Sequence, residues 1–134
     1  MKIIIGITVL LLSFTGILFV LPGHTTDPVV DLSEKALILT LYKGGRPSEE
    51  VTVSPDSAIV ARINSLLLEK RGKWKRSFVS FAPGIILRSE KFSINCQRNR
   101  IIINFENSAE QPVQVVTSLT TKEYSEIENA TAKH

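Results

Sequence analysis

Nineteen consecutive uncharged residues, mostly aliphatic, stand near the start of the chain, from Ile3 to Leu21. As a helix that rises about 1.5 Å per residue, this run would be about 28 Å long, close to the thickness of a bilayer's hydrocarbon core. A cleaved secretion signal has a shorter apolar region and ends at small residues, and only Gly23 and Thr25 stand where such residues would be. The sequence therefore predicts an uncleaved signal anchor over residues 1–21, with cleavage and a secreted form as the alternative.

The charges on either side of this run predict its orientation. Lys2 and the α-amino group precede the run, whereas acidic residues outnumber basic ones just after it. Positive charge favours the cytoplasmic side of a membrane. The short N-terminus is therefore expected in the cytoplasm, and the rest of the chain is expected to be extracytoplasmic and attached to the membrane through residues 3–21.

The chain beyond the anchor is long enough for one single-core domain. Residues 22–34 contain two prolines, a glycine and three acidic residues without apolar periodicity, which predicts a tether. The domain itself is expected over residues 35–130, and residues 131–134 are expected to form a frayed tail.

A hairpin and a helix are predicted in the first half of the domain. An apolar run over 36–42 and a second run over 51–53 flank Gly44 and Gly45, as two paired strands would. A helix is expected over 55–70, because Ser54 suits the N-cap, Pro55 suits the first helical turn, and apolar residues recur on one face.

The second half of the domain is mostly extended in pattern and ends in a short helix. Thr120 and Glu123 have the spacing of a capping box, which predicts the start of that helix. The remaining strand segments are expected at 78–81, 85–87, 92–96, 101–105 and 113–117. The predicted fold class is α+β: an N-terminal transmembrane helix followed by a small antiparallel sheet packed against one main helix, with a short C-terminal helix.

The residue types that carry most catalytic and metal chemistry are scarce. His24 falls in the tether and His134 is the last residue, so neither is held near a nucleophile. Cys96 is the only cysteine, and it continues the apolar face of its strand, which predicts a buried and unreactive thiol. No nucleotide-binding or metal-binding motif is present. We therefore expect no enzyme activity, no cofactor and no metal.

Positive charge is concentrated between Arg62 and Arg100, where ten basic residues stand against two acidic ones. Such a stretch is typical of a surface for anionic groups, but it also fits solvated charges that keep strand edges from aggregating. Trp74 either packs over the end of the helix or stacks on a ligand. The candidate binding residues are those of the densest part, Lys70, Arg71, Lys73, Trp74, Lys75 and Arg76.

Together these patterns predict a non-enzymatic, membrane-anchored binding module. Its expected partner is an envelope protein or an anionic polymer or lipid. Nucleic acid is not expected, because the predicted compartment is extracytoplasmic and no recognition motif accompanies the basic residues. The alternative is an immunity protein or inhibitor that blocks an exported enzyme or toxin. The sequence carries no signal for an oligomeric state.

Overall fold

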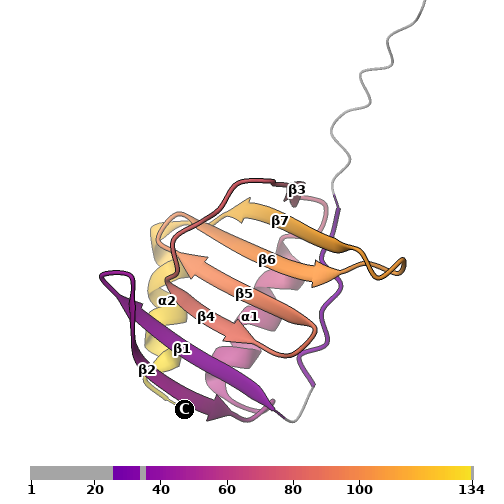
Figure 1. Cartoon of the computed structure of the whole chain (residues 1–134). Helices are drawn as coiled ribbons and strands as arrows, with labels where there is room; N and C mark the ends of the chain where they lie inside the picture. Colours follow the sequence, from indigo (N-terminus) through magenta and orange to yellow (C-terminus); the bar gives the residue numbers. More distant parts are fainter. Residues whose placement is uncertain (1–25, 34–35, 134) are drawn as a thin grey trace, which may run out of the picture.

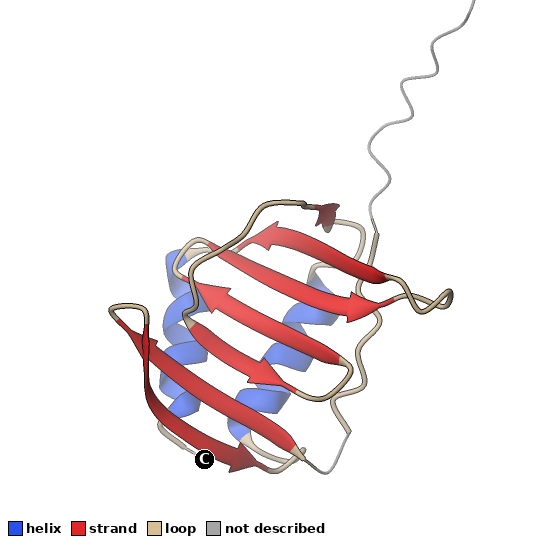
Figure 2. Ribbon diagram, in the orientation of Figure 1, coloured by secondary structure: helices blue, strands red, loops and turns tan. Residues whose placement is uncertain are grey.

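A computed structural model describes residues 26–33 and 36–133, which form one antiparallel sheet of seven strands with two helices on one of its faces (Figures 1 and 2). The strand order in the sheet is β2-β1-β4-β5-β6-β7-β3. The strands are β1 (Leu37–Lys43), β2 (Arg46–Val53), β3 (Lys75–Arg76), β4 (Ile85–Arg88), β5 (Phe92–Gln97), β6 (Arg100–Glu106) and β7 (Pro112–Ser118), and the helices are α1 (Ala58–Glu69) and α2 (Thr121–Thr131).

The predicted fold class, in which a small sheet packs on one main helix behind a membrane helix, is wrong. Within the described ranges, the sheet has seven strands, and α2 is almost as long as α1, with 11 residues against 12. Seven strands about 4.8 Å apart make a sheet about 29 Å wide, whereas one helix covers only about 10–12 Å. A single helix would therefore leave most of the apolar face in water, and both helices are needed.

The predicted membrane anchor, residues 3–21, lies outside the described residues. No helix in the part of the chain that the structure describes is long and apolar enough to cross a membrane. Residues 26–33, within the segment expected to be a tether, contact the domain: Leu32 is buried, and the Thr26 N–H donates to the carbonyl of Trp74 at 3.2 Å.

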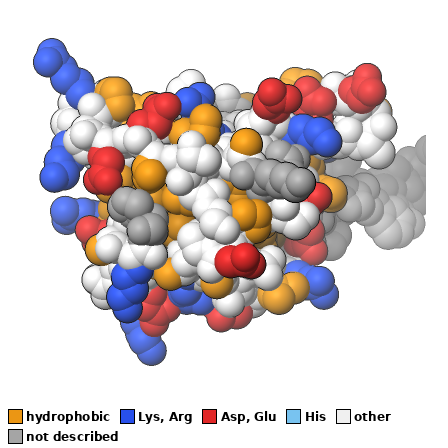
Figure 3. Space-filling model, turned by 90° about the horizontal axis from the view of Figure 1, so that it is seen from below, with side chains coloured by type: hydrophobic (Ala, Val, Ile, Leu, Met, Phe, Trp, Pro, Cys, Tyr) orange, Lys and Arg blue, Asp and Glu red, His pale blue; other side chains and the backbone are white. Residues whose placement is uncertain are grey.

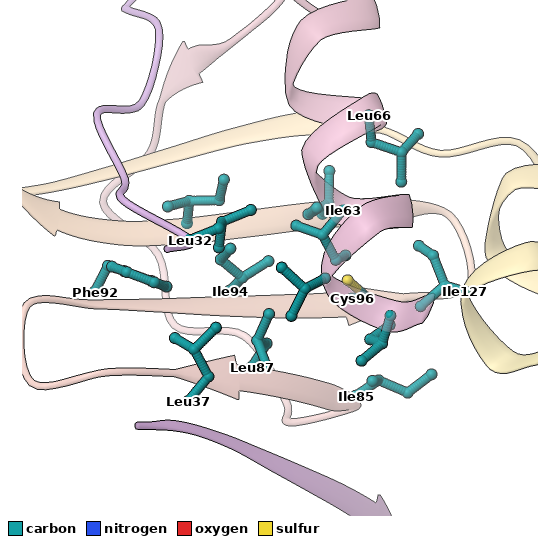
Figure 4. Packing of buried hydrophobic residues seen from close by; sticks show 14 of the residues in the cluster. Leu32, Leu37, Ile63, Leu66, Ile85, Leu87, Phe92, Ile94, Cys96 and Ile127 are labelled. Atoms are coloured by element: carbon teal, nitrogen blue, oxygen red, sulfur yellow. The ribbon is translucent and has the colours of Figure 1, made fainter. Parts of the chain in front are cut away.

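The core lies between the helices and one face of the sheet (Figure 4). Alternate residues of β5 and β6 point into it, as expected for strands with one covered face. Ile63 of α1 and Ile127 of α2 meet Ile94 and Cys96 of β5 in this layer. Of the predicted apolar stripe of α1, which comprises Ile59, Ile63, Leu66 and Leu67 with Val60 at its edge, all are buried except Leu67, which is partly buried against the core.

The chain passes around the sheet from one edge to the other and back (Figure 1). β2 lies at one edge, and α1 carries the chain across the helix-covered face to β3 at the opposite edge. Residues 77–84 then return over the other face to β4, which lies between β1 and β5. We call these residues the crossing loop and the face that they cross the helix-free face.

Two predicted elements differ from the structure. The segment 78–81 belongs to the crossing loop and is not a strand, because the chain leaves the edge of β7 after Ser77 donates to the carbonyl of Gln114. Helix α1 begins three residues later than predicted, with Ser57 as its N-cap. The hydroxyl of Ser54 instead accepts from the N–H of Asp56, within the kind of turn that proline and aspartate favour.

The strands predicted at 36–42, 85–87, 92–96, 101–105 and 113–117 are confirmed, as is the capping box. The predicted partner strand at 51–53 is the end of a longer strand, β2, which begins at Arg46, and the two-residue strand β3 was not predicted. Gly44 and Gly45 form the turn between β1 and β2 with φ values of 59° and 76°, the left-handed region that a two-residue hairpin turn requires. Thr120 and Glu123 cap α2 reciprocally, each side chain accepting from the other's backbone N–H. The sequence signals were reliable where they depended on residues close together in the chain.

Candidate functional site

The helix-free face is held to the crossing loop by side-chain amides. Asn95 of β5 accepts from the N–H of Gly84 at 2.9 Å and donates to the carbonyl of Ala82 at 3.0 Å. Gln97 donates to the same carbonyl, and Gln114 of β7 donates to the carbonyl of Val79 at 2.7 Å. These side-chain hydrogen bonds take the place of the backbone hydrogen bonds that a strand would form with its neighbour. They hold the loop against the sheet although it is not a strand.

Gly84 ends the crossing loop where it comes closest to β5. A Cβ atom at this position would lie 2.4 Å from the carbonyl oxygen of Cys96, well inside van der Waals contact. The carbonyl of Gly84 also accepts from the N–H of Tyr42 on β1. Glycine therefore allows the loop to descend into the sheet between β1 and β5.

Two open hollows lie on the helix-free face beside the crossing loop, one lined by Phe78 and the other by Phe81. The Phe78 hollow has a volume of about 460 Å³ and is lined by side chains of both charges, including Arg76, Arg88, Glu90 and Glu106. The Arg100 hollow has a volume of about 420 Å³ and is lined by Lys73, Lys75, Phe81, Asn99, Arg100, Val116, Thr117 and Ser118. The two hollows therefore differ in charge more than in size.

The Arg100 hollow is lined by three cations and, among the described residues, by no acidic side chain. Lys75 of β3 is opposite Val116 of β7, and Arg100 of β6 is opposite Ser118 of β7. Because β7 separates their strands, Lys75 and Arg100 start about 10 Å apart across the sheet and about 7 Å apart along it. Side chains of this length can both reach a ligand held above β7.

Arg100 is held in place by two neighbours. The guanidinium carbon lies 5.4 Å from the centroid of the Phe81 ring, which is cation–π distance. Its Nε–H donates to the Asn99 carboxamide at 3.1 Å. No acceptor for its two terminal Nη groups is recorded in the described part of the chain, so the outer edge of the guanidinium is available to a ligand.

Two of the six candidate residues belong to the packing of the domain. Lys70 pairs with Glu123 of α2 at 3.0 Å, which joins the ends of the two helices. Burial alone would raise the pKa of Glu123, but hydrogen bonds from Thr120 and Lys70 outweigh it and lower that pKa.

Trp74 is completely buried in the core, so it is not a surface on which a ligand stacks. Its indole Nε1 has no hydrogen-bond partner among the described residues.

The other four candidate residues lie on the surface in different places. Lys73 and Lys75 line the Arg100 hollow, whereas Arg76 lines the Phe78 hollow. Arg71 is exposed in the turn after α1, next to Gly72, whose N–H donates to the Asp27 carboxylate at 2.8 Å. The structure therefore does not bring all six residues to one surface.

Arg100 and Phe81 are the site residues that the sequence did not single out. Arg100 closes the hairpin turn between β5 and β6. Nothing local in the sequence shows that the next strand across the sheet is β7, followed by β3. The sequence predicts a strand for Phe81, whereas the structure places it in the crossing loop. No signal in the sequence links either residue to Lys73 and Lys75.

The single cysteine is buried, and the potential metal ligands of the described residues do not cluster. Cys96 is buried, as predicted, and its burial raises the pKa of its thiol to about 12. Within residues 26–33 and 36–133, no three His, Cys, Asp or Glu side chains gather in a way that could hold a metal ion.

On the side of the molecule seen from below, acidic and basic side chains are interspersed around hydrophobic ones (Figure 3).

Comparison with protein-family models, with curated proteins and with solved structures finds no match for this chain.

Proposed function

We propose that this protein is a non-enzymatic binding module that contacts an anionic group of its partner through the Arg100 hollow. The observation that carries the proposal is the lining of that hollow: Lys73, Lys75 and Arg100 surround it, and no acidic side chain of the described residues neutralises them there. Like charges placed together repel one another, so such a cluster is stabilised when an anion binds.

The contrast with other cations of the domain supports this assignment. Arg62 is paired with Glu126 at 2.7 Å and Lys70 with Glu123 at 3.0 Å, both across the two helices. Arg88 lies 3.7 Å from Glu50. These cations have an acidic neighbour within the domain. Among the described residues, Lys73, Lys75 and Arg100 form no such ion pair, as is also true of exposed cations such as Arg71 and Arg98, but these three line one hollow together.

The proposal includes the extracytoplasmic location that the sequence predicts. The uncharged run at residues 3–21 would direct the domain across the membrane, and the hollow would then face an envelope protein or an anionic polymer or lipid.

A salt-elution experiment tests the proposal. The full-length chain in a neutral detergent is applied to an immobilised anionic polymer and eluted with rising salt, which shortens the Debye length from about 10 Å at 0.1 M to about 3 Å at 1 M. The Lys73→Gln/Lys75→Gln variant is expected to elute at lower salt than wild type. Lys43→Gln/Lys122→Gln is the matched control, because both of its lysines are exposed and lie outside the hollow. If the two variants elute together, the proposal is wrong.

The alternative function, an inhibitor of an exported enzyme or toxin, has one observation in its favour. Phe78 is 93% exposed at the edge of its hollow, and a protruding aromatic side chain is a common anchor at protein interfaces. A photo-crosslinker at position 78, with Leu68 as the exposed apolar control, would test it. Recovery of one exported enzyme through position 78 alone would favour the inhibitor.

A further inference from the structure

We propose that the Arg100 hollow is a phosphoryl-binding site in which the guanidinium of Arg100 makes a two-point contact with two oxygens of the ligand. This inference deepens the proposed function and rests on it, since it names the chemistry of the anion that the hollow takes. The argument depends on how Arg100 is held, on the two lysines beside it and on the polar groups of β7.

The orientation of Arg100 is set before any ligand arrives. Phe81 supports one face of the guanidinium, and Asn99 occupies its Nε–H. The remaining donors are the paired Nη groups at the outer edge, whose spacing matches two oxygens of a phosphate or carboxylate. A fixed fork loses less conformational entropy on binding than a free arginine side chain does.

Charge and donor number favour a phosphoryl group over a carboxylate. The lining carries three positive charges from Lys73, Lys75 and Arg100. A carboxylate has one negative charge and two oxygens, so a single fork satisfies it and leaves both lysines without a partner. A phosphate monoester carries nearly two negative charges and three free oxygens, so it can take the fork and an ammonium group together.

The floor of the hollow adds donors and leaves room. Ser118 is opposite Arg100 in the ladder between β6 and β7, and its hydroxyl lies on the same face of the sheet. Val116 lies between Ser118 and Lys75 and offers no polar group to compete for the cations. The volume of about 420 Å³ is more than a phosphoryl group needs, so the rest of the ligand can extend along the open face.

The test compares arginine with lysine at two neighbouring positions. Arg100→Lys keeps the charge but removes the fork, and the expected loss of affinity is about tenfold, the value of one charge-assisted hydrogen bond. Arg98→Lys is the matched control, because Arg98 is exposed in the same hairpin turn and does not line the hollow. Asn99→Ala, a positioning variant, leaves the charge unchanged, frees Nε and is expected to weaken binding several-fold. Thermal melts confirm that each variant is folded.

Binding is followed by amide chemical shifts of the full-length chain in phosphatidylcholine nanodiscs. In the first arm, inorganic phosphate is added, with acetate as the carboxylate comparison. In the second arm, phosphatidic acid, whose headgroup is a phosphate monoester, replaces part of the phosphatidylcholine and no phosphate is added. Shifts at Lys75, Arg100 and Ser118 in the first arm identify a soluble phosphoryl ligand as the source, and shifts in the second arm identify a lipid headgroup.

The outcomes separate this inference from the proposed function. Equal responses to acetate and phosphate, or wild-type affinity in both Arg100→Lys and Asn99→Ala, would overturn the phosphoryl site while the salt-elution result could still support an anion-binding module. No response to either anion in wild type, together with equal elution of the two lysine variants, would overturn both. A loss confined to Arg100→Lys and Asn99→Ala supports the fork.

Discussion

Asn95 should be the residue that fixes the crossing loop to the helix-free face, and replacing it with alanine tests this directly. The side chain is 8% exposed and joins two backbone groups of the loop, the N–H of Gly84 and the carbonyl of Ala82. Asn95→Ala removes both bonds at once. The same change loosens the loop that carries Phe81 to the Arg100 hollow.

The expected magnitude follows from what each group loses. The carbonyl of Ala82 keeps Gln97 as a donor, so it loses only one of two bonds, worth about 0.5–1.5 kcal/mol. The N–H of Gly84 has no other acceptor in the described structure and is part-buried, so its loss costs about 1–2 kcal/mol. The sum is about 1.5–3.5 kcal/mol, which would lower the Tm of a domain of this size by roughly 6–16 °C.

Urea unfolding and hydrogen exchange would measure this effect. The exchange of the Gly84 and Tyr42 amides should accelerate in Asn95→Ala, because Tyr42 donates to the carbonyl of Gly84. Ser93→Ala is the control: Ser93 lies on the same face of β5, and its hydroxyl makes only a long 3.5 Å contact with Asn104. If Asn95→Ala is within about 0.5 kcal/mol of Ser93→Ala, these hydrogen bonds do not hold the loop.

Two other side chains give testable expectations. The pKa of Glu123 is lower in the folded state than its ordinary value of 4.5, so its contribution to stability is present above that value and is lost as pH falls through the lowered pKa. Glu123→Gln should therefore be less stable than wild type at neutral pH, by urea unfolding, and the difference should disappear in acid. Cys96, whose thiol pKa is raised to about 12, should react with a small thiol reagent far more slowly in the native chain than in urea. Cys96→Ser should destabilise by about 1–3 kcal/mol.

Each of these expectations has a result that contradicts it. A Glu123→Gln variant that keeps wild-type stability at neutral pH would mean that the contacts with Lys70 and Thr120 contribute nothing net. Labelling of native Cys96 at the rate of the unfolded chain would mean that the strand opens readily at that point.

The local elements could be predicted because their signals lie within a few residues of one another. The capping box at Thr120 and Glu123 and the turn at Gly44 and Gly45 each depend on one backbone segment. The apolar face of α1 likewise repeats within its own length. The predicted start of α1 is wrong because Ser54 begins a turn before the helix: its hydroxyl accepts from the N–H of Asp56, and its carbonyl accepts from the N–H of Ser57. Ser57 takes the N-cap position without a side-chain cap hydrogen bond.

The crossing loop could not be predicted, since its bonds come from distant strands. Its apolar residues at 78, 79 and 81 have the pattern of a strand. A segment with this pattern forms a strand only if the edge of a neighbouring strand is free to pair with it, and the sequence does not show whether one is. The amides that hold the loop belong to β5 and β7, as many as 35 residues away in the sequence. No spacing along the chain indicates which of several glutamines and asparagines will face the loop.

Sheet order also determines which cations form a site. Ten basic residues stand between Arg62 and Arg100, and the sequence alone gives no reason to treat Lys70 differently from Lys75. The fold brings Glu123 to Lys70 from 53 residues away, while β3 joins the far edge of the sheet beside β7 and brings Lys75 towards Arg100. An ion pair inside the domain weakens the field that a ligand would feel, whereas unpaired cations on adjacent strands reinforce it. An anion would therefore be attracted mainly by cations that the fold leaves without an acidic neighbour, and Lys75 and Arg100 are two such cations that the sheet brings together across β7.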